Sequence, residues 1–156
     1  MAGSILGNRV LRKEDPKFLT TGGVYVDDLN SEPLLVGALH ATFVRSTVAH
    51  ANITSIDIAD ALESPGVVAI YTAADLNLQP VAATYNPTAK RTLLASNKVR
   101  YVGEPVAVVL TKLANQGEDA AEKVIVDYDT LEVLIDIEQA MTSTTLIYEE
   151  CGSNVV

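Results

Sequence analysis

The chain has 156 residues, a length that allows one domain with a sizeable core. Hydrophobic residues make up 48% of it, which argues against disorder over most of the chain. The formal net charge is −9, and no basic patch is interleaved with aromatic residues, so nucleic acid is excluded as an expected partner.

The negative charge is unevenly distributed along the sequence. Residues 1–103 carry nine basic and nine acidic side chains, whereas residues 104–156 carry two basic and eleven acidic ones. A solvated acidic face explains this excess more simply than an electrostatic docking surface does.

The sequence shows no secretory or membrane-spanning signal. The longest apolar runs, such as 105–110, are far shorter than the ~20 residues of a membrane-spanning helix, so we expect no membrane partner. Residues 1–8 contain no charged stretch ahead of an apolar run, and the single cysteine, Cys151, cannot form an internal disulfide. We therefore expect a cytoplasmic protein.

In chain order, residues 1–33 carry few periodic apolar positions and are expected to form an extended N-terminal segment that is ordered only by packing. Residues 34–44 are β-prone. A strand over 52–58, a short helix over 59–64 and a buried strand over 67–72 follow, and Pro65-Gly66 ends the helix.

The second half repeats this strand, helix, strand order. The long connection over 77–98 shows little periodicity. A β-branched strand is predicted over 105–111, a helix over 117–124 and a strand over 124–131. The pattern indicates an α+β domain with short helices packed on a mixed β-sheet.

The stretch Lys98 to Leu110, KVRYVGEPVAVVL, raises a choice between an active site and a strand entry. Pro105 has no amide donor and is tolerated as the first residue of a strand, and Gly103 permits a turn before it. Glu104 is then the charged residue at this turn. The strand entry needs no chemistry to explain it.

Other candidate residues form no catalytic or metal-binding pattern. His40 and His50 lie ten residues apart with no other ligand at metal-binding spacing. The carboxylate pairs Asp27-Asp28 and Asp127/Asp129 lack a partner base or nucleophile, and Cys151 has no nearby basic residue to lower its pKa. The Thr-Thr-Gly-Gly run at 20–23 matches no phosphate-binding motif.

Four blocks of the sequence together resemble the molybdopterin-binding large subunit of the molybdenum hydroxylases, the family of carbon monoxide dehydrogenase, aldehyde oxidase and xanthine dehydrogenase. They are VLRKEDPKFLTTGGVYVDDL (10–29), LHATFVRSTVAHANITSIDIADALESPGVVAIYTAADL (39–76), KVRYVGEPVAVVL (98–110) and EDAAEKVIVDYDTLEVLIDIEQAM (118–141). They follow the family's order and cover most of the chain.

The resemblance implies an α/β-hammerhead domain over 34–145, preceded by the segment 1–33. Residues 146–156 resemble the segment that leads toward the molybdopterin-binding domains. The chain is then either part of a longer large subunit or one piece of a subunit encoded in two.

The family's enzymes oxidise aldehydes, heterocycles or carbon monoxide, using a molybdopterin cofactor, [2Fe–2S] clusters and FAD. The resemblance places their catalytic residues in later domains, so this chain is expected to bind no cofactor or metal and to be inactive alone. Its expected partners are the molybdopterin-binding part of the large subunit, an iron–sulfur subunit and an FAD subunit.

Three functions follow from these observations. The first is a structural and interaction domain whose interdomain contact is made by Tyr101, Gly103, Glu104 and Pro105, in which Glu104→Ala weakens assembly more than folding. The second is a free-standing small-molecule binding module, with the 77–98 connection covering a pocket. The third, an independent enzyme that uses Glu104 or the Asp127/Asp129 pair, lacks any cofactor-binding motif in the sequence.

Overall fold

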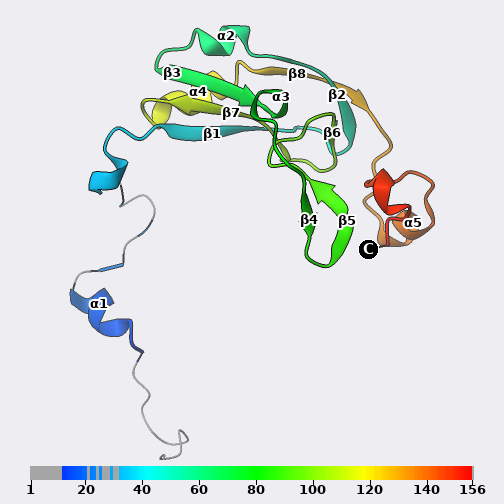
Figure 1. Ribbon diagram of the computed structural model, residues 1–156, viewed down its shortest axis with the longest axis horizontal. Coiled ribbons are helices and arrows are strands. Elements are labelled where there is room, and N and C mark those ends of the chain that lie inside the picture. Colours follow the sequence, from blue (N-terminus) through cyan, green and yellow to red (C-terminus); the bar gives the residue numbers. More distant parts are fainter. Residues whose placement is uncertain (1–11, 21, 24, 26–28, 30–31, 156) are drawn as a thin grey trace, which may run out of the picture. The chain divides into compact units, whose positions relative to one another are not determined.

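Figure 1 shows the computed structural model of the chain, in which residues 12–20, 22–23, 25, 29 and 32–155 are described. The chain divides into two compact units, Met1–Ala38 and Leu39–Val156. The sequence-based division instead began the main domain at residue 34 and set residues 146–156 apart as a separate segment.

The first unit contains a short helix, α1 (Asp15–Thr20), and a 3-10 turn, η2 (Pro33–Leu35). Asp15 lies in the first turn of α1, where a carboxylate favours the positive end of the helix dipole. The Thr20 hydroxyl donates a hydrogen bond to the carbonyl of Pro16 at 2.6 Å. The segment expected to be extended over 1–33 therefore includes a helix among its described residues. The carboxylate pair Asp27-Asp28 lies outside the described residues.

The second unit is built on two three-stranded antiparallel sheets. The first sheet has the order β1–β7–β3, and β7 pairs on both sides. Since β7 is central and covered, its Val106, Ala107 and Val109 are fully buried, as its near-continuous apolar run predicts. The bounds of the strands are β1 (His40–Arg45), β3 (Val67–Thr72) and β7 (Pro105–Thr111).

The second sheet has the order β6–β2–β8, with β2 in the centre. The Ser55 hydroxyl of β2 donates a hydrogen bond to the Asp127 carboxylate of β8 at 2.6 Å. Strands β2 and β3, which are consecutive in the chain, thus belong to different sheets. The bounds of the strands are β2 (Ala51–Asp57), β6 (Lys98–Val99) and β8 (Ile125–Thr130).

Three short helices connect these strands, as predicted for the first and last of them: α2 (Ala59–Leu62), α3 (Ala73–Leu76) and α4 (Asn115–Ala121). Helix α4 packs against β1 and β7. A Cβ atom at Gly117 would lie 2.0 Å from the Thr42 hydroxyl oxygen, so only glycine allows α4 to approach β1 this closely. This contact explains a glycine inside a helix.

The connection over 77–98, in which the sequence shows little periodicity, contains regular structure. Its strands β4 (Val81–Ala83) and β5 (Asn86–Arg91) pair as an antiparallel hairpin. Apart from the buried Ala89, β5 is mostly exposed on both faces. Apolar and polar residues therefore do not alternate in β5, so the usual sequence signal of a strand is missing.

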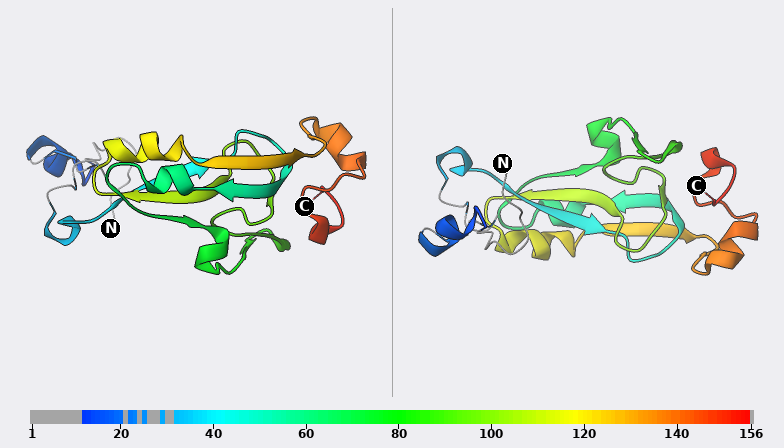
Figure 2. Two further views of the ribbon diagram at one scale, coloured as in Figure 1. Left: turned by 90° about the horizontal axis from the view of Figure 1, so that it is seen from above. Right: turned by 90° about the horizontal axis from the view of Figure 1, so that it is seen from below.

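The C-terminal part contains α5 (Ile137–Thr142) and a 3-10 turn, η3 (Glu149–Cys151). The Asp136 carboxylate caps α5 by accepting a hydrogen bond from the Gln139 amide at 2.8 Å. Figure 2 shows this part at the end of β8 that lies away from α4. Element η3 packs against β5, so it belongs to the second unit.

The α+β class and the short helices are confirmed, and both predicted strand, helix, strand units are present. The strands pair antiparallel in every ladder of the described residues, where a mixed sheet was expected. Within the same described part, no helix is long and apolar enough to cross a membrane.

Candidate functional site

The candidate contact begins with a tight turn over residues 101–104. The Glu104 amide donates a hydrogen bond to the Tyr101 carbonyl at 3.2 Å. Gly103, the third residue of the turn, has a φ of 92°, which residues other than glycine rarely adopt. Pro105 then starts β7. The strand entry inferred from the sequence is confirmed.

Three further hydrogen bonds fix this turn to the end of β1. The Gly103 amide donates to the Ser46 carbonyl at 2.8 Å, and the Ser46 amide donates to the Glu104 carbonyl at 2.9 Å. The Arg45 guanidinium donates to the Gly103 carbonyl at 2.9 Å. The turn is therefore held in one conformation from both sides.

The turn exposes two of its side chains to solvent and buries another. Tyr101 is 42% exposed and Val102 is 64% exposed, whereas Glu104 is only 4% exposed. One Glu104 carboxylate oxygen accepts a hydrogen bond from the Arg100 amide at 2.5 Å. Burial raises the pKa of Glu104, and the Arg100 hydrogen bond and the nearby Arg100 and Arg91 charges only partly oppose this.

Arg100 joins this turn to the C-terminal part of the chain. Its guanidinium carbon lies 4.8 Å from the centre of the Tyr148 ring, a cation–π distance, and its Nε donates to the Ile147 carbonyl at 3.0 Å. Burial raises the pKa of Tyr148. Residues 147 and 148 are thereby fixed beside β6.

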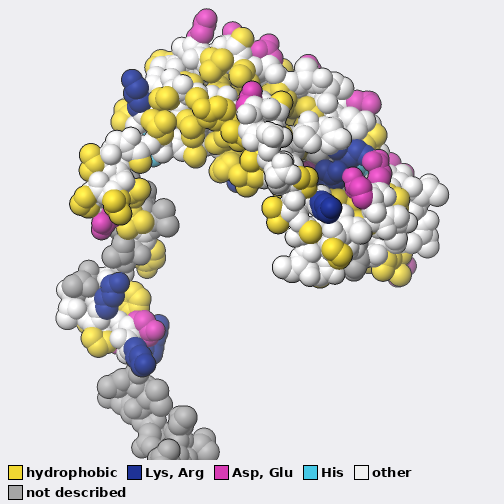
Figure 3. All heavy atoms as spheres, viewed as in Figure 1, with side chains coloured by type: hydrophobic (Ala, Val, Ile, Leu, Met, Phe, Trp, Pro, Cys, Tyr) yellow, Lys and Arg dark blue, Asp and Glu magenta, His cyan; other side chains and the backbone are white. Residues whose placement is uncertain are grey.

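A second polar pair lies next to this contact, two residues before Arg100 and one residue after Tyr148. The buried Lys98 ammonium donates to the Glu149 carboxylate at 2.7 Å, and this hydrogen bond lowers the pKa of Glu149. Figure 3 shows basic and acidic side chains side by side next to the C-terminal part. The charges that hold this part come from residues 51 positions apart.

His50 is buried near the same pair. Its Nδ1 lies 2.7 Å from the Glu132 carbonyl oxygen, and because a carbonyl only accepts, Nδ1 carries the proton. Its Nε2 is buried and has no hydrogen-bond partner in the described part of the chain. A cavity of about 390 Å³ is lined by His50, Lys98 and Glu149, together with neighbouring residues.

A larger cavity, of about 420 Å³, lies beside the turn. Glu104, Arg100 and Arg91 line it, and most of its remaining wall comes from residues 80–97. The hairpin region that the sequence suggested as a pocket cover thus does border a cavity, and positive side chains are part of its lining.

Comparisons with known proteins bear on the whole of this arrangement. Residues 20–132 match the family model described as the aldehyde oxidase and xanthine dehydrogenase a/b hammerhead domain. The chain belongs to this family.

This hammerhead chain is similar to large subunits of molybdenum hydroxylases. It is 38% identical, over 97% of its length, to the nicotine 6-hydroxylase large subunit of Paenarthrobacter nicotinovorans. It is 42% identical, over 87% of its length, to the carbon monoxide dehydrogenase large chain of Afipia carboxidovorans. The chain spans only 19% and 16% of these two relatives.

Solved structures agree with this assignment. The quinoline 2-oxidoreductase of Pseudomonas putida 86 matches with a TM-score of 0.75 and 39% identity, over 87% of this chain and 18% of that one. A Cu,Mo-containing CO dehydrogenase matches with a TM-score of 0.74 and 41% identity, over 86% of this chain and 17% of that one. The resemblance found in the sequence blocks is confirmed.

The other candidate residues of this hammerhead chain are not brought together. Asp127 and Asp129 are exposed on β8, and Asp127 accepts the Ser55 hydroxyl. His40 lies at the start of β1, and the Cys151 sulfur accepts the Thr88 hydroxyl at 3.3 Å. In the described part of the chain, no three His, Cys, Asp or Glu side chains are grouped so as to hold a metal ion.

Sequence reasoning missed the partners of the basic lead-in. Lys98 and Arg100 stand out before the turn, yet nothing local indicates that they contact Glu149 and Tyr148. The nearest signal is the tyrosine-acid pair Tyr148-Glu149 in the C-terminal stretch 146–156.

Proposed function

We propose that this chain is a structural and docking domain of the large subunit of a molybdenum hydroxylase. The observation that carries the proposal is its membership of the hammerhead family together with its alignment along most of its length to much longer large subunits. Oxidation of an aldehyde, a heterocycle or carbon monoxide then takes place in the assembled enzyme, outside this chain.

The proposed partners are the molybdopterin-binding part of the large subunit, an iron–sulfur subunit and an FAD subunit. A [2Fe–2S] cluster is held by four cysteine thiolates in most proteins, and the sequence contains only Cys151. The clusters of the assembled enzyme therefore need ligands beyond these 156 residues. The cofactors belong to the assembly and not to this chain.

The turn over residues 101–105 is the proposed contact with a neighbouring domain. Tyr101 offers an exposed aromatic side chain, the kind of residue that concentrates binding energy in interfaces. Because hydrogen bonds to Ser46 and from Arg45 already fix the backbone, little conformational entropy is lost when a partner binds. In this arrangement Gly103, Glu104 and Pro105 shape the contact, and Tyr101 and Val102 touch the partner.

Co-expression tests the proposal directly. The chain is expressed with the reading frames that neighbour its gene, and copurification with a molybdopterin-containing polypeptide is measured. We expect Tyr101→Ala to reduce copurification about fivefold or more, since loss of an interface aromatic costs more than about 1 kcal/mol. Tyr85→Ala is the matched control, because Tyr85 is 77% exposed in the hairpin. If the chain stays alone while the other subunits assemble and turn over normally, the proposal fails.

A second candidate function is a small-molecule binding module, which the 420 Å³ cavity beside Glu104 supports. Arg91 and Arg100 in its lining favour a small anionic ligand over a neutral one. Thermal shift of the isolated chain with small aldehydes and small carboxylates tests this function. A shift produced by a carboxylate and abolished by Arg91→Ala supports it, and no shift with either class argues against it.

A further inference from the structure

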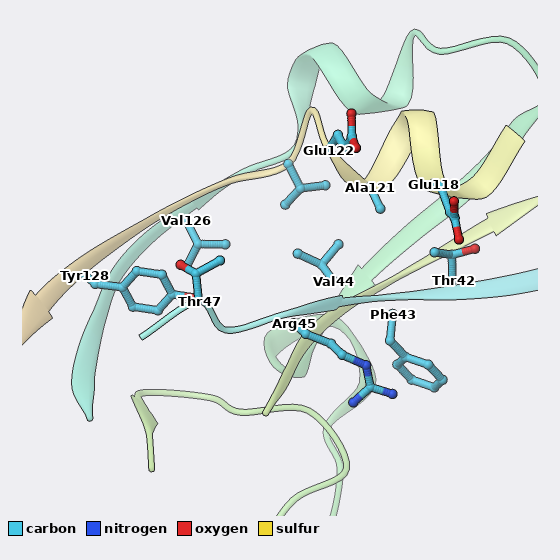
Figure 4. Close-up of a pocket in the computed structure, with 11 residues that line it drawn as sticks. Thr42, Phe43, Val44, Arg45, Thr47, Glu118, Ala121, Glu122, Val126 and Tyr128 are labelled. Carbon is cyan, nitrogen blue, oxygen red and sulfur yellow. The ribbon is translucent and has the colours of Figure 1, made fainter. Parts of the chain in front are cut away.

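A third cavity lies between two strands that each end a sheet. Strand β1 pairs only with β7, and β8 pairs only with β2, within residues 32–155. A groove of about 570 Å³ separates them, and α4 lies along its upper side (Figure 4). No residue of β2 lines the groove, so β8 is the strand of the second sheet that faces β1.

Apolar side chains line part of the groove, beside the polar residues Thr42, Thr47, Glu118 and Glu122. Val126 and Tyr128 point from β8 into it, and Val44 points into it from β1 (Figure 4). The side chains of Phe43 and Arg45 point away from the gap on the other face of β1. The groove therefore lies between β1, α4 and β8, on the face of β1 that carries Val44.

The two facing strands can accept an additional strand. Pairing is regular from His40 to Val44 in β1, and the register shift comes only between Val44 and Arg45. An edge strand presents a row of unpaired N–H and C=O groups, which an extended peptide can pair with. Within residues 32–155, β1 and β8 each keep one such edge unpaired beside this groove.

The rim of the groove is acidic. Glu118 and Glu122 are four residues apart on α4, so they lie on the same face of the helix, and both are exposed. Neither forms an ion pair in the described part of the chain. The Arg45 guanidinium is bound to the Gly103 carbonyl and lies on the other face of β1, so it does not neutralise them.

We propose that this groove binds an extended segment of a partner polypeptide that alternates apolar residues with lysine or arginine. The segment pairs with the free edge of β1 or β8, its apolar side chains pack on Val126 and Tyr128, and its basic side chains reach Glu118 and Glu122. The inference does not rest on the proposed function, because it concerns a different surface from the 101–105 turn.

The experiment uses the full chain and a seven-residue peptide that alternates valine with lysine. Residue-resolved amide hydrogen exchange is measured with and without the peptide. We expect added protection in β1 or β8, confined to amides that exchange rapidly in the free chain. A peptide with glutamate in place of lysine is expected to bind about tenfold more weakly, since repulsion from two exposed carboxylates replaces attraction.

Matched variants separate the groove from general charge. Glu118→Lys is expected to weaken binding of the lysine peptide about fivefold. Asp119→Lys makes the same charge change on the neighbouring exposed residue of α4, which does not line the groove, and is expected to leave the affinity unchanged. Equal binding of the two peptides, protection elsewhere in the chain, or closure of the groove by a second copy of the chain would each overturn the proposal. The peptide comparison needs no variant, so it stands even if Glu118→Lys does not fold.

Discussion

The first sheet and the polar cluster around Glu104 are held together in different ways. In β7 the buried residues Val106, Ala107 and Val109 follow one another in a single strand, and they pack against one helix and two neighbouring strands. In the polar cluster, Arg100 contacts Ile147 and Tyr148, and Lys98 contacts Glu149. The sheet is built on apolar area, and the cluster is built on single polar contacts between distant segments.

This difference determines how each region responds to change. Apolar burial is roughly proportional to area, so loss of part of a side chain removes part of the stabilisation. A buried polar group instead costs its full desolvation penalty when its one hydrogen-bond partner is removed. Variants of the sheet core therefore test the contribution of apolar burial, and variants of the cluster test the contribution of single hydrogen bonds.

The largest effect is expected in the sheet. Val109→Ala removes two methyl groups from a fully buried side chain and leaves a cavity, so the free energy of unfolding should fall by about 2–3 kcal/mol. Denaturant unfolding measures this loss. Val68→Ala in β3 is the matched control, because Val68 is 49% exposed, and it should cost less than about 1 kcal/mol. Equal losses from both variants would contradict the placement of the core.

Glu104→Ala tests the cluster and should cost about 1–3 kcal/mol, because the Arg100 amide loses its acceptor inside the protein. Glu104→Gln keeps an acceptor oxygen and should cost less. The sequence-based expectation was that Glu104→Ala affects assembly more than folding. Since the carboxylate is buried within its own domain, we now expect both to suffer. Unfolding of the isolated chain and copurification with the partner polypeptides separate the two effects.

Gly103→Ala tests the turn alone. A Cβ at Gly103 meets no atom within 4 Å, so its cost comes only from the φ of 92°, which should reduce the free energy of unfolding by about 1–2 kcal/mol. Gly117→Ala is the contrasting variant, because its Cβ would collide with Thr42 and its cost comes from crowding. A Thr42→Ala background, which removes the hydroxyl, should relieve the second cost and leave the first unchanged.

The sequence predicts the sheet better than the cluster for the same physical reason. Strand β7 was predicted with its exact bounds because a β-branched run and Pro105 are local signals. The β4–β5 hairpin was missed because β5 is exposed on both faces. The contacts of Arg100 with Tyr148 and of Lys98 with Glu149 depend on how β6 meets the C-terminal part, and no local pattern encodes that. The resemblance to a family supplied the fold and the enzyme class, while the buried state of Glu104 required coordinates.

The smallest expected effect is a dependence of stability on pH that comes from Glu104. Its pKa is raised in the folded chain by burial, so the unfolded chain releases the proton first as pH rises. Above the ordinary glutamate pKa of about 4.3, the folded state therefore loses stability relative to the unfolded state until pH passes the folded pKa.

Asp75 and Glu149 have lowered pKa values and act in the opposite direction, because their contribution to stability is lost as pH falls. Comparing wild type with Glu104→Gln at each pH cancels those contributions, because both chains share them. The difference in free energy of unfolding should move against the wild type as pH rises above the ordinary glutamate pKa. A flat difference would show that the Arg100 hydrogen bond and the nearby positive charges fully offset burial at this carboxylate, and a difference that moves in favour of the wild type would show that they outweigh it.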